Sequence, residues 1–240
     1  MAHPALQYLT SEYLEHNPTW DVQDTPWKAG LVAATLDRNR IKPASICEVG
    51  CGSGGCLAEL RAKYPEVELS GFDIAPDAAS FWKRYEGLNI HFEVGDVLQK
   101  ATQKYDVLLM LDVIEHVADP HAFLAGLHGK ASYYVFHIPL DLSAASVFRE
   151  TPLLYVRDKV GHIHYFTKQL ALSLLRESGY QIVDASYTGA AFTAPARSWK
   201  TLIARPLRRI IHALLGKDRG VRLLGGETLI VLARHQESRA

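Results

Sequence analysis

The stretch from Ala44 to Cys56, ASICEVGCGSGGC, constrains the fold of this chain more than any other. An apolar run ends at Glu48, and glycines follow at positions 50, 52, 54 and 55. This pattern predicts a buried strand that breaks into a tight loop and then opens a helix, whose free backbone N–H groups can hold a ligand. Glycine is required where a side chain would keep the ligand away from the backbone.

A second apolar run, VELSGFDI, ends in Asp73 about twenty residues after the glycine loop. A carboxylate at the end of the second strand is well placed to accept both hydroxyls of a ribose. The two features together indicate a cofactor that contains a nucleoside.

Two cofactor classes fit the glycines. Gly50, Gly52 and Gly55 satisfy the dinucleotide spacing, whereas Glu48 with Gly50, Gly52 and Gly54 gives E-x-G-x-G-x-G. The acidic residue before the loop, the segment EVGDV around Asp96 and the later run YDVLLMLDVIEHV favour the second pattern. An NAD(P)-dependent oxidoreductase would also need a substrate domain, for which 240 residues leave little room.

With these motifs the chain resembles the class I S-adenosylmethionine (SAM)-dependent methyltransferases, especially the ubiquinone-type O-methyltransferases, over about residues 25–190 and the final strand. The resemblance implies that SAM binds at the glycine loop and leaves as S-adenosylhomocysteine. Asp73 would bind the ribose, Asp96 the adenine amino group, and Asp112 the methionine amino group or the acceptor. The cofactor-binding set implied in this way is Glu48, Gly50, Cys51, Gly52, Gly54, Asp73, Ile74, Asp96, Val97 and Asp112.

The expected function is methyl transfer to a small-molecule or lipid-linked acceptor, with oxygen favoured as the acceptor atom. An NAD(P)-binding oxidoreductase and a non-catalytic SAM-binding protein remain as alternatives. Because sulfonium methyl transfer is intrinsically favourable, alignment of the reactants can supply much of the catalysis.

The order of patterns along the chain predicts alternating strands and helices, as in a doubly wound parallel sheet. Strands are expected near 44–49, 67–73, 89–94, 105–111, 132–138, 181–188 and 227–235, with helices near 54–64, 76–86, 119–129 and 166–180. The expected fold is a Rossmann-like α/β sheet of seven strands, mostly parallel with the last strand antiparallel, covered by helices on both faces. One domain, 1–240, would include an N-terminal helical cap at 1–40 and an insertion at 188–222.

The sequence Asp112-Val-Ile-Glu115-His116 matches the D/E-x-x-E-H pattern with which ubiquinone-pathway and small-RNA O-methyltransferases hold a divalent metal. His162 or His164 could supply a further ligand, since the two alternate onto one face if that segment is extended. The same I-E-H also occurs in methyltransferases that use no metal, and no metal site is assigned.

His137 is the predicted catalytic base, because it lies near the end of the fifth strand and an imidazole can accept a hydroxyl proton. A histidine bonded to a neighbouring carbonyl is the competing interpretation. Pro139 is expected to end that strand. In the cap, Lys28 could bind the methionine carboxylate, and Trp20 or Trp27 could exclude water; a surface lysine with packed tryptophans is the alternative.

The insertion at 188–222 has eight basic residues and one acid, Asp218. Its apolar residues recur at steps of three and four, which predicts an amphipathic helix with a basic face. This helix could be a lid, a dimer face or a contact with an anionic membrane through 199–215; packing on the protein is favoured. The basic residues are Arg197, Lys200, Arg205, Arg208, Arg209, Lys217, Arg219 and Arg222, and the stripe comprises Trp199, Leu202, Ile203, Leu207, Ile210, Ile211, Leu214 and Leu215.

Composition bounds the partners and the setting. The formal net charge is zero and no aromatic residues interleave with the arginines, so nucleic acid is not an expected partner. Cys47, Cys51 and Cys56 crowd around the glycine loop, where small buried residues are expected rather than disulfides or a zinc site. The N-terminus shows no secretory signal, and a cytoplasmic protein is expected.

Overall fold

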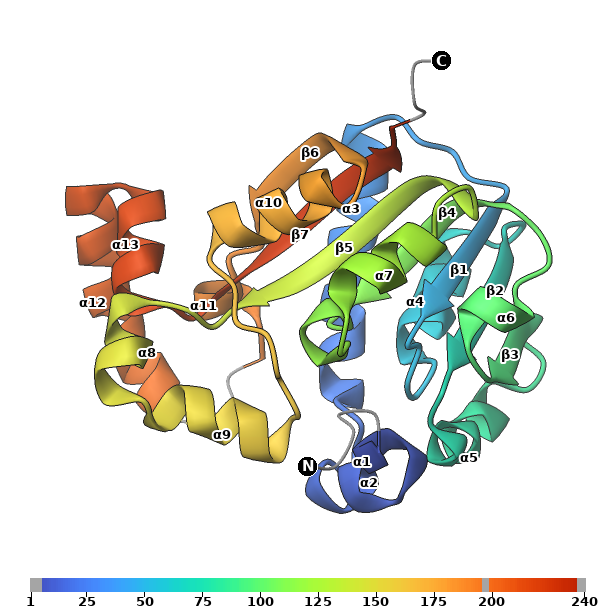
Figure 1. Cartoon of the computed structure of the whole chain (residues 1–240), viewed down its shortest axis with the longest axis horizontal. Coiled ribbons are helices and arrows are strands. Elements are labelled where there is room, and N and C mark those ends of the chain that lie inside the picture. The colour runs from blue at the N-terminus through green and yellow to red at the C-terminus, as the bar shows by residue number, and fades with distance from the viewer. Residues whose placement is uncertain (1–5, 196–198, 237–240) are drawn as a thin grey trace.

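The computed structural model describes residues 6–195 and 199–236; of residues 6, 7 and 199–204 only the backbone is described. Its sheet has seven strands in the order β3-β2-β1-β4-β5-β7-β6. All neighbours are parallel except β7, which pairs antiparallel with β5 and β6. This confirms the predicted fold class (Figure 1). The strands are β1 Ser45–Val49, β2 Glu68–Asp73, β3 Ile90–Val94, β4 Tyr105–Leu111, β5 Ala131–Leu140, β6 Tyr180–Tyr187 and β7 Glu227–His235.

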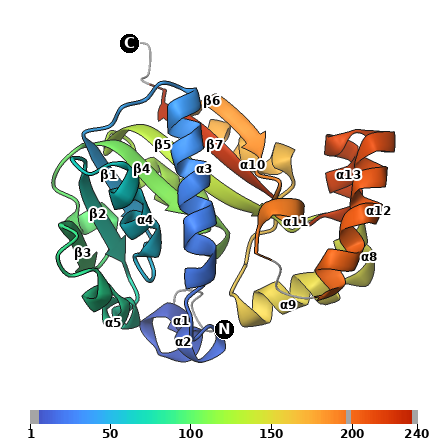
Figure 2. The same cartoon turned by 180° about the vertical axis from the view of Figure 1, so that it is seen from behind.

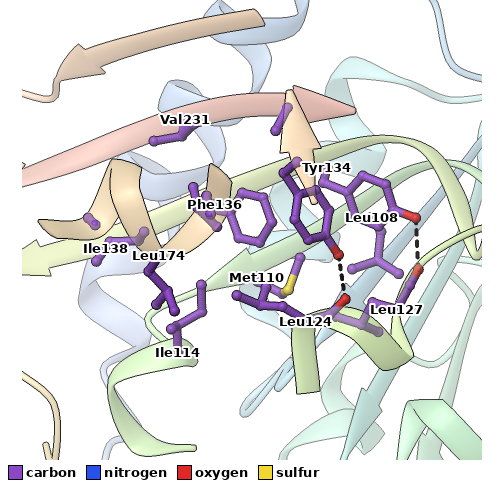
Figure 3. Packing of buried hydrophobic residues seen from close by; sticks show 14 of the residues in the cluster. Leu108, Met110, Ile114, Leu124, Leu127, Tyr134, Phe136, Ile138, Leu174 and Val231 are labelled. Carbon is purple, nitrogen blue, oxygen red and sulfur yellow. Dashed lines mark hydrogen bonds between the residues drawn. The ribbon is translucent and has the colours of Figure 1, made fainter. Parts of the chain in front are cut away.

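Helices cover both faces of the sheet, as expected. Helices α3 (Thr25–Arg38) and α4 (Gly55–Lys63) lie on one face (Figure 2), and α7 (Pro120–Gly126) and α10 (Lys168–Glu177) on the other (Figure 1). Each face therefore has its own buried apolar cluster. In the cluster under α7 the hydroxyl of Tyr134 donates to the carbonyl of Leu127 at 2.8 Å, so the buried phenol is paired (Figure 3).

The helix predicted at 76–86 is broken into a short α-helix, α5 (Ala79–Trp82), between two 3-10 helices, η2 (Pro76–Ala78) and η3 (Lys83–Tyr85). Trp82 stacks on Phe92 with ring centroids 5.1 Å apart, and its indole N–H donates to the Gly52 carbonyl at 2.9 Å. We attribute the break to these tertiary contacts, which hold Trp82 against the glycine loop. A short helix, α6 (Val97–Lys100), follows β3.

The expectation that Pro139 ends the fifth strand is wrong, since β5 continues through Pro139 to Leu140. Strand β4 pairs with β5 no further than His137, whereas β7 still pairs with Pro139 and Leu140. A proline is tolerated in a strand where its missing N–H has no ladder partner. Because β4 ends before it reaches Pro139, the side of β5 that faces β4 has no ladder partner at this position.

The sequence patterns also missed two helices between β5 and α10, α8 (Ala144–Arg149) and α9 (Thr151–Lys159). Several of their large apolar residues are not buried in the core: Phe148 is 91% exposed, and Leu154 and Tyr155 are exposed as well. A helix without a buried apolar face gives no periodic signal.

The N-terminal region contains α1 (Leu6–Leu9), α2 (Glu12–His16) and the turn η1 (Val22–Asp24) before α3. The insertion contains α11 (Ala190–Thr193), α12 (Trp199–Leu215) and α13 (Lys217–Leu224), and η4 (Ile114–His116) follows β4. Arg197 lies outside the described residues, as do the side chains of Trp199, Lys200, Leu202 and Ile203. Within the described residues, no helix is long and apolar enough to cross a membrane.

Candidate functional site

A cavity of about 360 Å³ opens at the carboxyl ends of β1, β4 and β5. This is the edge of a parallel sheet at which ligands bind. The N-terminal segment, the glycine loop and the end of α9 form its walls. The residues that line it include Tyr13, Trp20, Trp27, Lys28, Glu48, Gly50, Cys51, Gly52, Asp112, His116, His137, Asp141, Tyr155, Val156, Val160, His162 and Thr228.

The glycine loop has a backbone conformation that favours glycine. Gly50, Gly52 and Gly54 all have positive φ, between 50° and 75°. A Cβ atom on Gly52 would lie 2.6 Å from Nε1 of Trp20, which packs directly over the loop. A side chain at position 52 is therefore excluded by both conformation and space.

Asp73 lies at the end of β2, beside the glycine loop, and only 8% of it is exposed. Its two carboxylate oxygens accept the N–H groups of Gly52 at 2.7 Å and Ala75 at 2.8 Å. Burial raises the pKa of Asp73, and the two N–H donors oppose that rise. The carboxylate thus fixes the loop, and its role toward a ribose stays a prediction.

Four predicted cofactor residues besides Asp73 are absent from the lining of this cavity, within the described chain: Gly54, Ile74, Asp96 and Val97. Asp96 caps α6, where its side chain accepts the N–H of Leu98 at 2.9 Å. Val97 is buried in the core, and Ile74 is 40% exposed. Their roles toward a cofactor remain predictions.

Lys28, Asp112, His137 and Thr228 form one chain of polar contacts, in which His137 is buried and the other three are partly buried. Asp112 pairs with Lys28 Nζ at 2.7 Å through Oδ2 and with His137 Nδ1 at 2.6 Å through Oδ1. Burial alone would raise the pKa of Asp112, but His137 and Lys28 outweigh it and hold that pKa well below its usual range. Asp112 is thus an anion, and each of its two carboxylate oxygens is held by one of these partners.

His137 is 3% exposed, and each of its ring nitrogens has a partner. Asp112 faces Nδ1, while Nε2 lies 2.8 Å from the hydroxyl of Thr228. A carboxylate only accepts hydrogen bonds, so Nδ1 carries the proton and, in the neutral ring, Nε2 is the basic nitrogen. The predicted catalytic role of His137 stays a prediction; the proton would have to reach Nε2 in place of the Thr228 hydroxyl.

Glu48 is almost fully buried, and its Oε2 atom has no hydrogen-bond partner. Burial raises its pKa from the ordinary 4.5 to about 8; Lys28 opposes the rise and Asp73 adds to it. An unsatisfied buried carboxyl is costly, which makes it a candidate ligand-binding group.

Glu115, His116 and His162 come together beside the cavity, with one ligand atom from each lying within 4.8 Å of the others. His116 and His162 line the cavity, whereas Glu115 is fully buried and is not one of its lining residues. Glu115 Oε1 is 3.9 Å from His116 Nε2 and 4.0 Å from His162 Nε2. Both oxygens of Glu115 lack a hydrogen-bond partner, although the side chain is fully buried. A buried carboxylate that has no hydrogen-bond partner and faces two imidazole nitrogens is a suitable ligand set for a divalent cation.

The structure does not bring the whole predicted metal pattern together. Asp112 turns away toward Lys28 and His137. Of the two alternative histidines, His162 joins the cluster, whereas His164 Nε2 lies 2.8 Å from the carbonyl of Val117. Burial, and next the neighbouring His162, lower the pKa of His116 to about 4, so this ring is neutral and can offer a lone pair.

Comparison with known proteins decides the family. Residues 26–185 match the family model described as "Methyltransferase domain". The chain belongs to the SAM-dependent methyltransferases. It is 35% identical over 192 residues to a ubiquinone biosynthesis O-methyltransferase of Cereibacter sphaeroides (strain ATCC 17029 / ATH 2.4.9), covering 70% of this chain and 74% of that protein. A ubiquinone biosynthesis O-methyltransferase of Roseobacter denitrificans is 28% identical over 193 residues, which again cover 70% of this chain and 74% of that protein.

Solved methyltransferase structures share the fold. Magnesium protoporphyrin IX methyltransferase (ChlM) from Synechocystis PCC 6803, crystallised with SAM, superposes with a TM-score of 0.61 and 14% identity, covering 98% of this chain and 99% of that one. The plantazolicin methyltransferase BpumL, crystallised with a pentazolic desmethylPZN analog and S-adenosylhomocysteine, superposes with a TM-score of 0.63 and 16% identity, covering 98% of this chain and 97% of that one. Because the chain belongs to the SAM-dependent methyltransferases, SAM is its cofactor, and the oxidoreductase alternative falls away.

Sequence reasoning missed two functional candidates of the methyltransferase. Asp141 follows β5 directly and lies 2.7 Å from His162 Nδ1, and Thr228 at the start of β7 contacts His137. A carboxylate just past a parallel strand is the signal that could have marked Asp141. Thr228 offers no comparable signal, because only the pairing of β5 with β7 places it there.

Proposed function

We propose that this methyltransferase methylates a hydroxyl oxygen of a small phenolic acceptor, which binds beside Glu115, His116 and His162. The observation that carries this proposal is the buried Glu115 carboxyl group, which has no hydrogen-bond partner and lies beside His116 and His162 at the cavity. The choice of a phenol draws on the likeness to proteins named ubiquinone biosynthesis O-methyltransferases. Methyl transfer to oxygen releases the hydroxyl proton, so the acceptor side of the site must favour an oxyanion.

The residues present fit a divalent cation, since one carboxylate and two imidazole nitrogens form a ligand set common to several metals. When bound there, such a cation would lower the pKa of the acceptor hydroxyl and orient its oxygen. Glu115 and the two Nε2 atoms would hold it. His137 would take the hydroxyl proton at Nε2, with Asp112 stabilising the protonated ring.

On the cofactor side, SAM supplies the methyl group. Asp112 and Lys28 present opposite charges to the cavity, which suits the amino and carboxylate groups of the methionine portion. The glycine loop offers backbone close to the ligand, and Trp20 and Trp27 exclude water from the same space. Holding the two reactants in line is the main task of these residues.

We also propose a lipid-linked acceptor, reached from an anionic membrane surface through α12. Leu207, Ile210 and Leu214 form a stripe on α12 and are 57%, 57% and 76% exposed. Arg205 and Arg208 point the other way, since they donate to carbonyls of α11, the residue after it and the turn after α13. None of the described side chains of α12 lines the cavity, so the stripe is free for an external partner.

The test is a product assay with purified full-length enzyme, SAM and simple catechols and phenols, with and without an isoprenoid tail. Mass spectrometry should find methyl ethers of at least one phenol. Exhaustive treatment with EDTA should abolish turnover, and Mg²⁺, Mn²⁺ or Zn²⁺ should restore it. Full activity after chelation would remove the cation from the proposal, whereas methylation of amines alone would remove oxygen as the acceptor atom.

A further inference from the structure

The two imidazoles that face Glu115 are each held from behind. His162 Nδ1 lies 2.7 Å from Asp141 Oδ2, and His116 Nδ1 lies 3.0 Å from the carbonyl oxygen of Gly161. The hydroxyl of Tyr8 is also 2.7 Å from His116 Nδ1. A carboxylate and a carbonyl can only accept, so both rings carry their proton on Nδ1 and turn an unprotonated Nε2 toward Glu115.

Asp141 is itself well anchored. It follows Leu140, the last residue of β5, and its carbonyl accepts the hydroxyl of Ser146 at 2.7 Å. Ser146 also belongs to the capping box with Ser143 that starts α8. The backbone that bears the Asp141 side chain is thus fixed on its N-terminal side by β5 and on its C-terminal side by the cap of α8.

His162 has a matching anchor at the other end of the α8–α9 segment. The next two backbone N–H groups, those of Ile163 and His164, donate to the carbonyl of Glu115 at 2.9 and 3.1 Å. The ring of His162 therefore lies between Asp141 and the side chain of Glu115, and it is 7% exposed. Only rotation about its own side-chain bonds would move Nε2 away from Glu115.

We propose that Asp141 is the positioning residue of this centre, whose hydrogen bond to His162 keeps Nε2 unprotonated and aimed at the cation. The inference rests on the proposed cation at Glu115, His116 and His162, and it adds a side chain that would not touch the cation. Outer hydrogen bonds of this kind fix the tautomer of a metal-binding histidine and raise its basicity. Their loss costs metal affinity without removing a ligand.

The same bond would couple the cation to the acceptor wall. Asp141 and His162 lie at the two ends of the segment that contains α8 and α9. Tyr155, Val156 and Val160 of that segment line the cavity. A cation that restrains His162 therefore also restrains the wall against which the acceptor packs.

Titration of the full-length enzyme with Co²⁺, in the presence of S-adenosylhomocysteine, tests the proposal through the visible absorption of the bound ion. D141A and D141N should bind Co²⁺ about 10- to 100-fold more weakly than wild type and change the absorption band. D141E should recover part of the loss, because it restores an acceptor-only group. The affinity for S-adenosylhomocysteine should stay unchanged in all three. D119N is the matched control, since Asp119 caps α7 through the N–H of Ala122 and does not line the cavity.

The outcomes separate this inference from the proposed function. Wild-type enzyme that binds no Co²⁺ would overturn the centre and the role of Asp141 together. Co²⁺ affinity in D141A and D141N equal to that of D119N would leave the centre standing and overturn Asp141 as its positioning residue. If D141A does not fold, as judged by its binding of S-adenosylhomocysteine, D141N and D141E carry the same comparison with a side chain of similar size.

Discussion

Lys28 Nζ lies 2.7 Å from Asp112 Oδ2, so an ion pair joins the first turn of α3 to the end of β4 inside the cavity. Burial would lower the pKa of Lys28, but Asp112 outweighs it and keeps that pKa above its usual range. Both charges are thus present at neutral pH. A zwitterionic amino acid group offers each of them an opposite charge, which the proposed binding of the methionine portion requires.

Replacing Lys28 by methionine should therefore weaken binding of S-adenosylhomocysteine by about 1.5–3 kcal/mol, the usual value of a hydrogen bond to a charged group. Calorimetry on the folded variant measures the change. K63M is the matched control, because Lys63 pairs with Asp37 on the surface at 2.6 Å. Equal affinity in K28M and K63M would show that Lys28 does not contact the cofactor.

The positions of Glu48, the glycines and Asp73 were predictable because they lie within two consecutive strand ends, and strand–loop–helix patterns fix where such residues stand. The arrangement of the residues after β4 was not predictable. Asp112 has a φ of 58°, and the short turn Ile114–His116 follows it, so Asp112 and Glu115 face different partners. A spacing of three residues puts two side chains on one face only in a continuous helix.

Asp141 and His162 show the same limit at longer range. They are 21 positions apart, and two helices that give no periodic signal separate them. Their contact follows from the tertiary packing of that segment. The fold class, by contrast, follows from the seven apolar runs and the helical segments between them, because alternating strands and helices form a doubly wound sheet.

The carboxylate of Asp73 is the second target. In D73N one oxygen becomes an NH₂ group that faces a backbone N–H, either that of Gly52 or that of Ala75. Both the loop geometry and the charge offered to a ribose are lost, and we expect binding of S-adenosylhomocysteine to weaken by about 1.5–3 kcal/mol. D77N, one short turn further along, serves as control. Unchanged affinity in folded D73N would rule out the ribose assignment.

Glu48 predicts a pH dependence of stability in the enzyme without cofactor. Its folded-state pKa is about 8 against an ordinary 4.5, chiefly because of burial. Between these values the folded state keeps a proton that the unfolded state has lost, so this contribution is fully present below pH 4.5 and disappears as pH rises toward 8. The loss is at most about 1.4 kcal/mol per pH unit.

In E48Q this proton linkage is absent. The difference in Tm between E48Q and wild type should therefore grow in favour of the variant as pH rises from about 5 to 8. Thermal unfolding in matched buffers measures it. A difference that is constant with pH, or that shrinks, would contradict the raised pKa of Glu48.

His137 is tested by H137Q, which can still bond to Thr228 but cannot act as a base. If His137 accepts the acceptor proton, kcat should fall by about 100-fold or more, as for other general bases, while KM for SAM changes little. Steady-state kinetics with an identified phenol separate the two parameters. A rise in KM for SAM with kcat preserved would instead show that His137 acts by orienting Asp112.

The outward stripe of α12 gives the last prediction. An interfacial helix is stabilised by apolar burial and by attraction of basic residues to anionic lipid, about 1 kcal/mol per residue. Among the described side chains of α12 and α13, the exposed basic residues are Arg209, Lys217, Arg219 and Arg222. The enzyme should sediment with vesicles that contain phosphatidylglycerol and not with pure phosphatidylcholine, and salt should release it.

Substitution of Leu214, 76% exposed, by aspartate should abolish sedimentation and leave turnover of a soluble phenol unchanged, because no described side chain of α12 lines the cavity. V183D is the matched control, since Val183 is an exposed apolar residue on β6. A lid predicts the opposite pair of results, no vesicle binding and a raised KM for the soluble acceptor in L214D. A dimer face predicts a third result, in which L214D converts a dimer into a monomer in sedimentation velocity without any effect of lipid.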